Sequence, residues 1–155
     1  MADSPTAEDP TLELATTPAL ELGSALAARD VSSVELVQLY LDRIERLDLD
    51  IGAYVTVAAP QALAAAEEAD ERSRTGSRLG PLDGVPISIK DFVDTAGIRT
   101  TAGTRDWWDR VPDHDAAVVT KLRGAGLVIL GKSAIPELTG GNYVENATSG
   151  VCRNP

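Results

Sequence analysis

The chain has very few of the residues that build disulfides and metal sites. It contains one cysteine, Cys152, and one histidine, His114. An internal disulfide needs two thiols, and this pair cannot complete a zinc site, so we expect a reducing cytoplasmic location and no metal. A Ser-His-Asp relay would have to use His114, which lies between two aspartates at a predicted helix start. Exposure to solvent explains that histidine better.

Basic residues and long apolar runs are also scarce. Fourteen basic against twenty-four acidic residues give a net charge of -10. Such a charge repels phosphate backbones, so we expect no direct binding to nucleic acid or to an anionic membrane. No apolar run approaches the roughly 20 residues of a spanning helix, and the acidic start is unlike a signal peptide. With 43% hydrophobic and 25% charged residues, the composition is that of a globular domain.

The first 16 residues differ in composition from the rest. They are rich in Pro, Thr, Asp and Glu without apolar periodicity, so we expect residues 1–16 to form a flexible acidic tail. The domain would then cover residues 17–155. A short helix is predicted after Pro18, with a break at Arg29. Ser32 followed three residues later by Glu35 is typical of a capping box, and the apolar spacing that follows predicts a helix over 33–47.

Helical and extended patterns alternate over the remainder. Strands are predicted over 53–57 and 127–130, and a strand-like segment over 84–91. Helices are predicted from Pro60 to about residue 72, with a packed alanine face at Ala62, Ala66 and Ala69, and over 116–123. Residues 131–155 contain several glycines and predict mostly loop. A helix stopped by glycine before a buried strand is typical of an α/β layer fold.

Several polar and aromatic side chains have a simple interpretation. The charges on the alanine-rich helix are expected to form a solvated face: Glu67, Glu68, Asp70 and Glu71. Trp107 and Trp108 fall in a predicted loop. They could cap a substrate entrance, but packing beneath the loop is the better explanation.

Lys90 is the candidate with chemical interest. It directly follows an apolar strand-like segment, which would deliver its ammonium to a sheet edge, where ligand sites form in α/β folds. If the side chain is enclosed, burial disfavours the charged form, and the neutral amine can act as a base. The alternatives are a pairing with Asp91 or extension into solvent. Position alone favours those alternatives, because most lysines stay in water.

The order of several motifs favours the role of Lys90 as a base over these alternatives. Residues 79–91, LGPLDGVPISIKD, resemble the GPLxGVPIxxKD segment of the amidase-signature family. The hydroxyl-rich turn at 100–104, the helix and glycines at 115–126, and the Leu-Gly-Lys at 130–132 follow in the family's order. Glu137 and the Arg-Asn-Pro at 153–155 complete the pattern. The similarity runs from about residue 20 to the end, and separated blocks in order are more specific than one motif.

The resemblance implies a fold and a reaction. The fold would be the N-terminal part of an α/β/α sandwich with a mixed β-sheet, here incomplete. The family hydrolyses carboxylic amides to an acid plus ammonia or an amine without a cofactor, using a nucleophilic serine, a bridging cis-peptide serine and a lysine base. Lys90 corresponds to that lysine and is expected to be enclosed. Leu138, Thr139 and Gly140 would line the acyl pocket, or form an ordinary loop.

The serine motif of the family follows the Asn-Pro at which this sequence stops. We therefore expect the chain to be truncated before the serines, inactive alone, and prone to aggregation. Its expected partners are a small-molecule amide and a complementary C-terminal segment or further copies of the chain. Two alternatives remain: the glutaminase A-type subunit of a tRNA-dependent amidotransferase, and a non-enzymatic fragment.

The sequence departs from the family pattern at two places. Ser133 and Ala134 stand where the family often has Thr-Asn, and Asp83 stands where His or Ala is more usual. Neither change affects Lys90 directly.

Overall fold

A computed structural model of the chain describes residues 10–141 and 143–154. The helices in this part are α1 (Pro10–Thr16), α2 (Ala19–Ala28), α3 (Ser33–Ile51), α4 (Ala59–Thr75) and α5 (Ala117–Gly124), with short 3-10 turns η1 (Arg105–Trp107) and η2 (Glu137–Thr139). The strands are β1 (Tyr54–Val57), β2 (Pro86–Lys90), β3 (Val128–Ser133), β4 (Glu145–Asn146) and β5 (Gly150–Val151).

The start of α3 is fixed by two caps. Ser32 accepts from the Glu35 amide at 3.1 Å, and the Glu35 carboxylate accepts from the Ser32 amide at 2.9 Å, which is the predicted capping box. Asp70 on α4 adds a second cap, because its two oxygens accept from the amides of Ser33 and Val34. The prediction of a fully solvated acidic face was therefore wrong at Asp70, which ties α4 to α3.

The central sheet has the order β1-β3-β2, in which β1 runs antiparallel and β2 parallel to β3. The mixed sheet expected from the sequence is thus confirmed. Ile87 pairs with Ile129 and Ile89 pairs with Lys132, so β3 contains one extra residue between the two pairs. This β-bulge lies at Gly131, where a Cβ atom would stand 2.1 Å from the Thr56 carbonyl oxygen.

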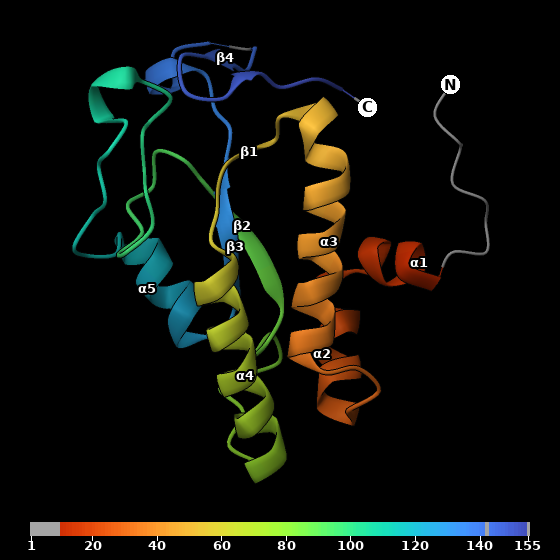
Figure 1. Cartoon of the computed structure of the whole chain (residues 1–155). Helices are drawn as coiled ribbons and strands as arrows, with labels where there is room; N and C mark the ends of the chain where they lie inside the picture. The colour runs from red at the N-terminus through yellow and green to blue at the C-terminus, as the bar shows by residue number, and fades with distance from the viewer. Residues whose placement is uncertain (1–9, 142, 155) are drawn as a thin grey trace.

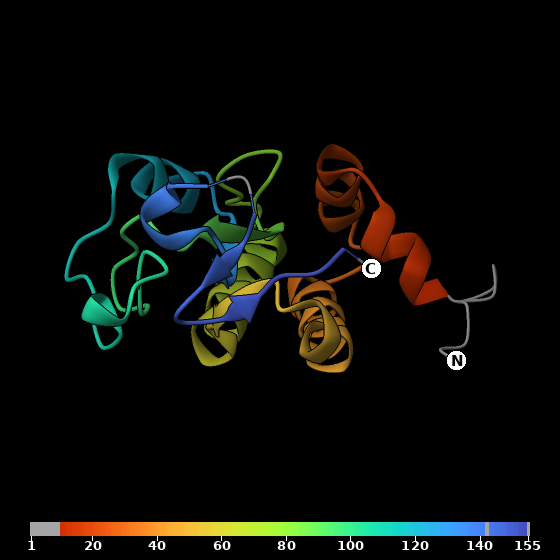
Figure 2. The ribbon, with the colours of Figure 1, turned by 90° about the horizontal axis from the view of Figure 1, so that it is seen from above.

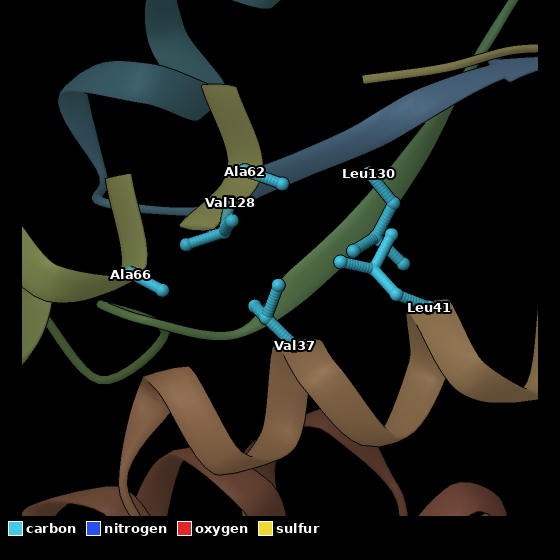
Figure 3. Close-up of a cluster of buried hydrophobic side chains, with 6 residues drawn as sticks. All are labelled: Val37, Leu41, Ala62, Ala66, Val128 and Leu130. Carbon is cyan, nitrogen blue, oxygen red and sulfur yellow. The ribbon is translucent and has the colours of Figure 1, made fainter. Parts of the chain in front are cut away.

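Helices cover both faces of the sheet (Figure 1). Val128 and Leu130 pack against Val37 and Leu41 of α3 and against two alanines of α4, as Figure 3 shows; these are Ala62 and Ala66. Ile129, which points the opposite way along β3, packs with Ile89 and with Val119 of α5. The result is an α/β/α arrangement of three layers, with α2 packed behind α3 through Leu22, Leu26 and Leu36.

The expectation of a flexible tail over residues 1–16 needs correction in its second half. Residues Pro10–Thr16 form α1, whose Leu14 packs against the cluster of α2 and α3. The Tyr40 hydroxyl also donates to the Ala15 carbonyl at 3.2 Å. Leu14 and the Tyr40 hydrogen bond join this helix to other elements, and such contacts leave no periodic pattern in its own sequence. Residues 1–9 lie outside the described part.

The C-terminal part contains more structure than predicted. β3 continues through Ser133, and the β4–β5 hairpin follows it. In Figure 2 this blue segment crosses above the sheet near β1. The Arg153 amide donates to the Ile51 carbonyl at 2.8 Å, which joins the last described residues to the end of α3.

None of the helices described combines the length and the apolar character needed to cross a membrane.

Candidate functional site

β2 and β3 are parallel, so their carboxyl ends meet at one edge of the sheet, where Lys90 pairs with Ser133. The structure thus places Lys90 at a sheet edge, as the sequence indicated. Its side chain is exposed, however, and the expectation of an enclosed Lys90 was wrong for this chain. Strand alternation explains the direction, because Ile89 faces α5 and Lys90 points to the other face.

Asp91, the next residue, does not pair with Lys90. Its carboxylate is fully buried and accepts from the Thr101 hydroxyl at 2.5 Å and from the Thr101 amide at 3.2 Å. Its carbonyl accepts from the Ala102 amide at 3.1 Å. The hydroxyl-rich turn at 100–104 is therefore folded back onto the end of β2.

The loop carrying Leu138, Thr139 and Gly140 lies at the same edge. The Leu138 amide donates to the Ala102 carbonyl at 2.9 Å, so backbone bonds run from Asp91 through Ala102 to Leu138. Leu138 and Thr139 have φ values of 49° and 62°. Two successive non-glycine residues in this conformation store strain, which concentrates at functional sites. All three residues are exposed in the chain.

The β4–β5 hairpin closes over this edge. Asn146 is buried and donates to the Ile135 carbonyl at 2.6 Å, while its Oδ1 accepts from the amides of Thr148 and Ser149. Thr148 Oγ1 lies 3.3 Å from Thr101 Oγ1. Four segments thus converge at the carboxyl ends of β2 and β3. They are the end of β2, the turn at 100–104, the loop at 138–140 and the β4–β5 hairpin.

The enclosed lysine is Lys132, which sequence reasoning did not single out. It is fully buried, and its Nζ donates to the Val93 carbonyl and to the hydroxyls of Thr95 and Thr100 at 3.0 and 2.9 Å. Burial lowers the pKa of Lys132 to about 8. The bulge at Gly131 turns Lys132 to the face of Ile89, so simple alternation along β3 could not have placed it.

The two tryptophans and the histidine lie in the segment after the hydroxyl-rich turn. Trp107 lies under the Arg110 guanidinium at 5.2 Å and Trp108 under that of Arg99 at 4.5 Å. Each ring is nearly half exposed and is held by a cation–π contact, so the predicted packing beneath the loop was wrong. His114 is exposed, as the sequence predicted, and its Nδ1 lies 2.6 Å from Asp113 Oδ1.

An open groove of about 650 Å³ runs beside this edge. Its lining is largely apolar and includes Phe92, Val93, Trp107 and Val118. Among the described residues, no three His, Cys, Asp or Glu side chains gather closely enough to hold a metal ion. The described edge offers an exposed amine, several hydroxyls and strained backbone, which are groups suited to proton transfer and to binding a polar ligand.

Comparisons with known proteins agree with this geometry. The family model described as Amidase matches residues 35–155. The A subunit of glutamyl-tRNA(Gln) amidotransferase from Acidothermus cellulolyticus is 44% identical over 137 residues, which cover 88% of this chain and 27% of that protein. The corresponding subunit from Geobacter sulfurreducens is 47% identical over 135 residues, covering 87% of this chain and 28% of its own length.

A solved structure shows the same fold. Peptide amidase from Stenotrophomonas maltophilia superposes with a TM-score of 0.84 at 34% identity, over 90% of this chain and 30% of that one. The chain therefore spans less than a third of the length of these relatives. The family match, the sequence relatives and the shared fold lead to one conclusion: this chain belongs to the amidase family of C–N hydrolases and corresponds to the N-terminal part of its members.

Proposed function

We propose that this chain supplies the lysine base of an enzyme that hydrolyses linear carboxylic amides. The observation that carries the proposal is the position of Lys90, which ends β2 next to Asp91, from which backbone hydrogen bonds run through Ala102 to the strained residue Leu138. The family resemblance assigns the base to this residue. In the proposed reaction, neutral Lys90 takes a proton through a bridging serine, and a second serine attacks the amide carbonyl. Backbone N–H groups then stabilise the oxyanion.

The exposed state of Lys90 has a direct consequence for this function. A lysine acts as a base only without its proton, and desolvation favours that neutral form. We therefore propose that a complementary segment, which carries the serines, covers Lys90 and the exposed residues 138–140. The chain alone would be inactive, because the proposed nucleophile lies on that complementary segment.

Complementation tests this function. Ammonia release from simple primary amides would be measured for the chain, for the downstream segment of a relative, and for the two joined in one polypeptide. Hydrolysis by the joined protein only, and its loss on Lys90→Ala, is the expected result. Lys121→Ala is the matched control, since Lys121 is an exposed lysine on α5. Turnover by the chain alone would contradict the proposal.

A second candidate is the glutaminase subunit of an amidotransferase. It is favoured by the identity of 43–47% to A subunits of that enzyme. The acidic N-terminal residues and the Ser133-Ala134 pair, which departs from the family pattern, favour a stand-alone amidase instead. The two candidates differ in substrate and in partner. Glutamine as the preferred substrate, together with stable co-purification of a second subunit, would select the amidotransferase; hydrolysis of other amides without a partner would select the amidase.

A further inference from the structure

The Lys132 ammonium makes its hydrogen bonds with one irregular segment. Its Nζ donates to the Val93 carbonyl, to Thr95 Oγ1 at 3.0 Å and to Thr100 Oγ1 at 2.9 Å. These acceptors belong to the stretch between Asp91 and Thr104, which contains neither helix nor strand. That stretch begins directly after Lys90, the residue assigned as the base.

The acceptors within reach of the two hydroxyls indicate which form of the amine fits. Thr95 Oγ1 donates to the Val93 carbonyl at 3.1 Å, and Thr100 Oγ1 donates to the Ile98 carbonyl at 3.0 Å. Both hydroxyls thus present lone pairs to Nζ. Three acceptors surround an ammonium that has three N–H donors. Lys132 therefore acts as a charged donor here and not as a base.

The segment held by Lys132 also determines the geometry at the sheet edge. Its two ends are joined, because Thr101 donates to the Asp91 carboxylate and Ala102 to the Asp91 carbonyl. Ala102 in turn accepts from Leu138. If the interior of the segment moved, Thr101 and Ala102 would move with it. The end of β2 and the loop at Leu138 would then lose their common anchor.

We propose that Lys132 is a positioning residue. Its ammonium fixes the segment 93–100 and thereby holds Lys90 and the loop 138–140 in a fixed position relative to each other. The effect of Lys132 on catalysis rests on the function proposed above. Lys132 touches neither substrate nor reacting atoms, because it points to the α5 face of the sheet while Lys90 points to the other. It acts through backbone connections.

Amide hydrogen exchange on the 155-residue chain tests the local effect. Lys132→Met keeps a long apolar stem but removes the three donors. The amides of Thr101, Ala102 and Leu138 should then exchange at least tenfold faster, while amides in the middle of α3 keep their wild-type rates. Unchanged exchange at the three amides would overturn the proposal. An equal acceleration throughout α3 and α4 would also overturn it, because it would indicate a general loss of stability.

A second variant covers the case in which Lys132→Met does not fold. Thr100→Val keeps the side-chain shape and removes one acceptor of Lys132. The same three amides should respond, by a smaller factor. Lys121→Met is the matched control, since this exposed lysine belongs to α5, and it should alter none of them.

The effect on the reaction is tested by the kinetics of amide hydrolysis in the polypeptide that joins this chain to the downstream segment of a relative. Lys132→Met should lower kcat between about tenfold and 10²-fold and leave KM within twofold, because small misplacement of a catalytic group slows the chemical step. A raised KM with unchanged kcat would overturn the positioning role. If Lys90→Ala left the rate unchanged, the proposed function would fail, whereas the exchange experiment would still decide whether Lys132 holds the segment.

Discussion

Three charged side chains, Asp83, Asp91 and Lys132, are fully buried in the described part of the chain. Each has hydrogen-bond partners in the fold. Asp83 accepts from both Arg72 Nε and Nη2, at 3.0 and 2.7 Å, and from the Leu79 amide. Burial alone would raise the pKa of Asp83, but these hydrogen bonds outweigh it and lower the pKa. Breaking such a pair leaves an uncompensated charge, which is costly.

Replacing Asp83 should therefore destabilise the fold. In Asp83→Ala, Arg72 loses its partner and the Leu79 amide loses its acceptor, at a cost of about 3 kcal/mol in the free energy of unfolding. Urea unfolding at pH 7 measures this value. The exposed pair of Arg74 and Glu71 supplies the control, and Glu71→Ala should leave the midpoint unchanged. Equal midpoints for the two variants would contradict the assignment.

Lys132 should give the chain an alkaline pH dependence. Burial lowers its pKa from 10.5 to about 8, with Asp91, Asp94 and Asp115 opposing the shift and Arg110 adding to it. Between pH 8 and 10.5 the folded chain binds fewer protons than the unfolded chain, so the stability from this group rises with pH, by about 3 kcal/mol in total. Urea unfolding of wild type and Lys132→Met across this range measures the difference. Parallel curves would contradict it.

The two lysines show how far residue-level reasoning extends. Lys90 was found because a family motif and a strand pattern both end there. Lys132 was missed because its burial depends on the bulge at Gly131 and on acceptors more than 30 residues away in sequence. Asp83 was noted only as a departure from the family. Its partner Arg72 lies on another element, so local sequence patterns could not reveal the pair.

At the scale of elements, local signals were sufficient where local interactions determine the structure. The capping box at Ser32, the alanine face of α4 and the glycines after α5 were all read from nearby residues. Two features depend on contacts between elements and were missed: α1, held mainly by Leu14 and Tyr40, and the cap that α4 provides for α3 through Asp70.

That second cap can be tested with a matched pair on α4. Asp70→Ala removes the acceptor for the amides of Ser33 and Val34 and should cost about 1 kcal/mol or more in the free energy of unfolding. Glu67→Ala, at an exposed position on the same helix, should have little effect. Thermal unfolding followed by circular dichroism measures both. If the two variants melt together, Asp70 does not stabilise α3.

At the scale of the molecule, β2 is an edge strand whose outer side is open, since β3 is its one partner among the described strands. Phe92, two residues after the end of β2, is exposed, and so are Leu138 and Tyr143 in the segment after β3. An open strand edge beside apolar side chains favours association with another chain. The family resemblance predicted this incompleteness. The sequence could not predict how the four segments converge, because that requires the register of β2 on β3.

The isolated chain should therefore self-associate. Sedimentation velocity over a tenfold range of concentration should show a mass that rises with concentration, and Phe92→Lys should reduce it by placing a charge beside the open edge. A monomer at every concentration would show that the edge is protected in another way.

The most direct test of the account is the rate of amide hydrolysis by the joined protein with Lys90 replaced. We predict that Lys90→Ala lowers kcat by at least about 10³-fold, a loss within the range expected for an essential general base, while Lys121→Ala keeps the parent rate. A Lys90→Ala enzyme that hydrolyses amides within twofold of the parent rate would contradict the central claim that Lys90 is the base.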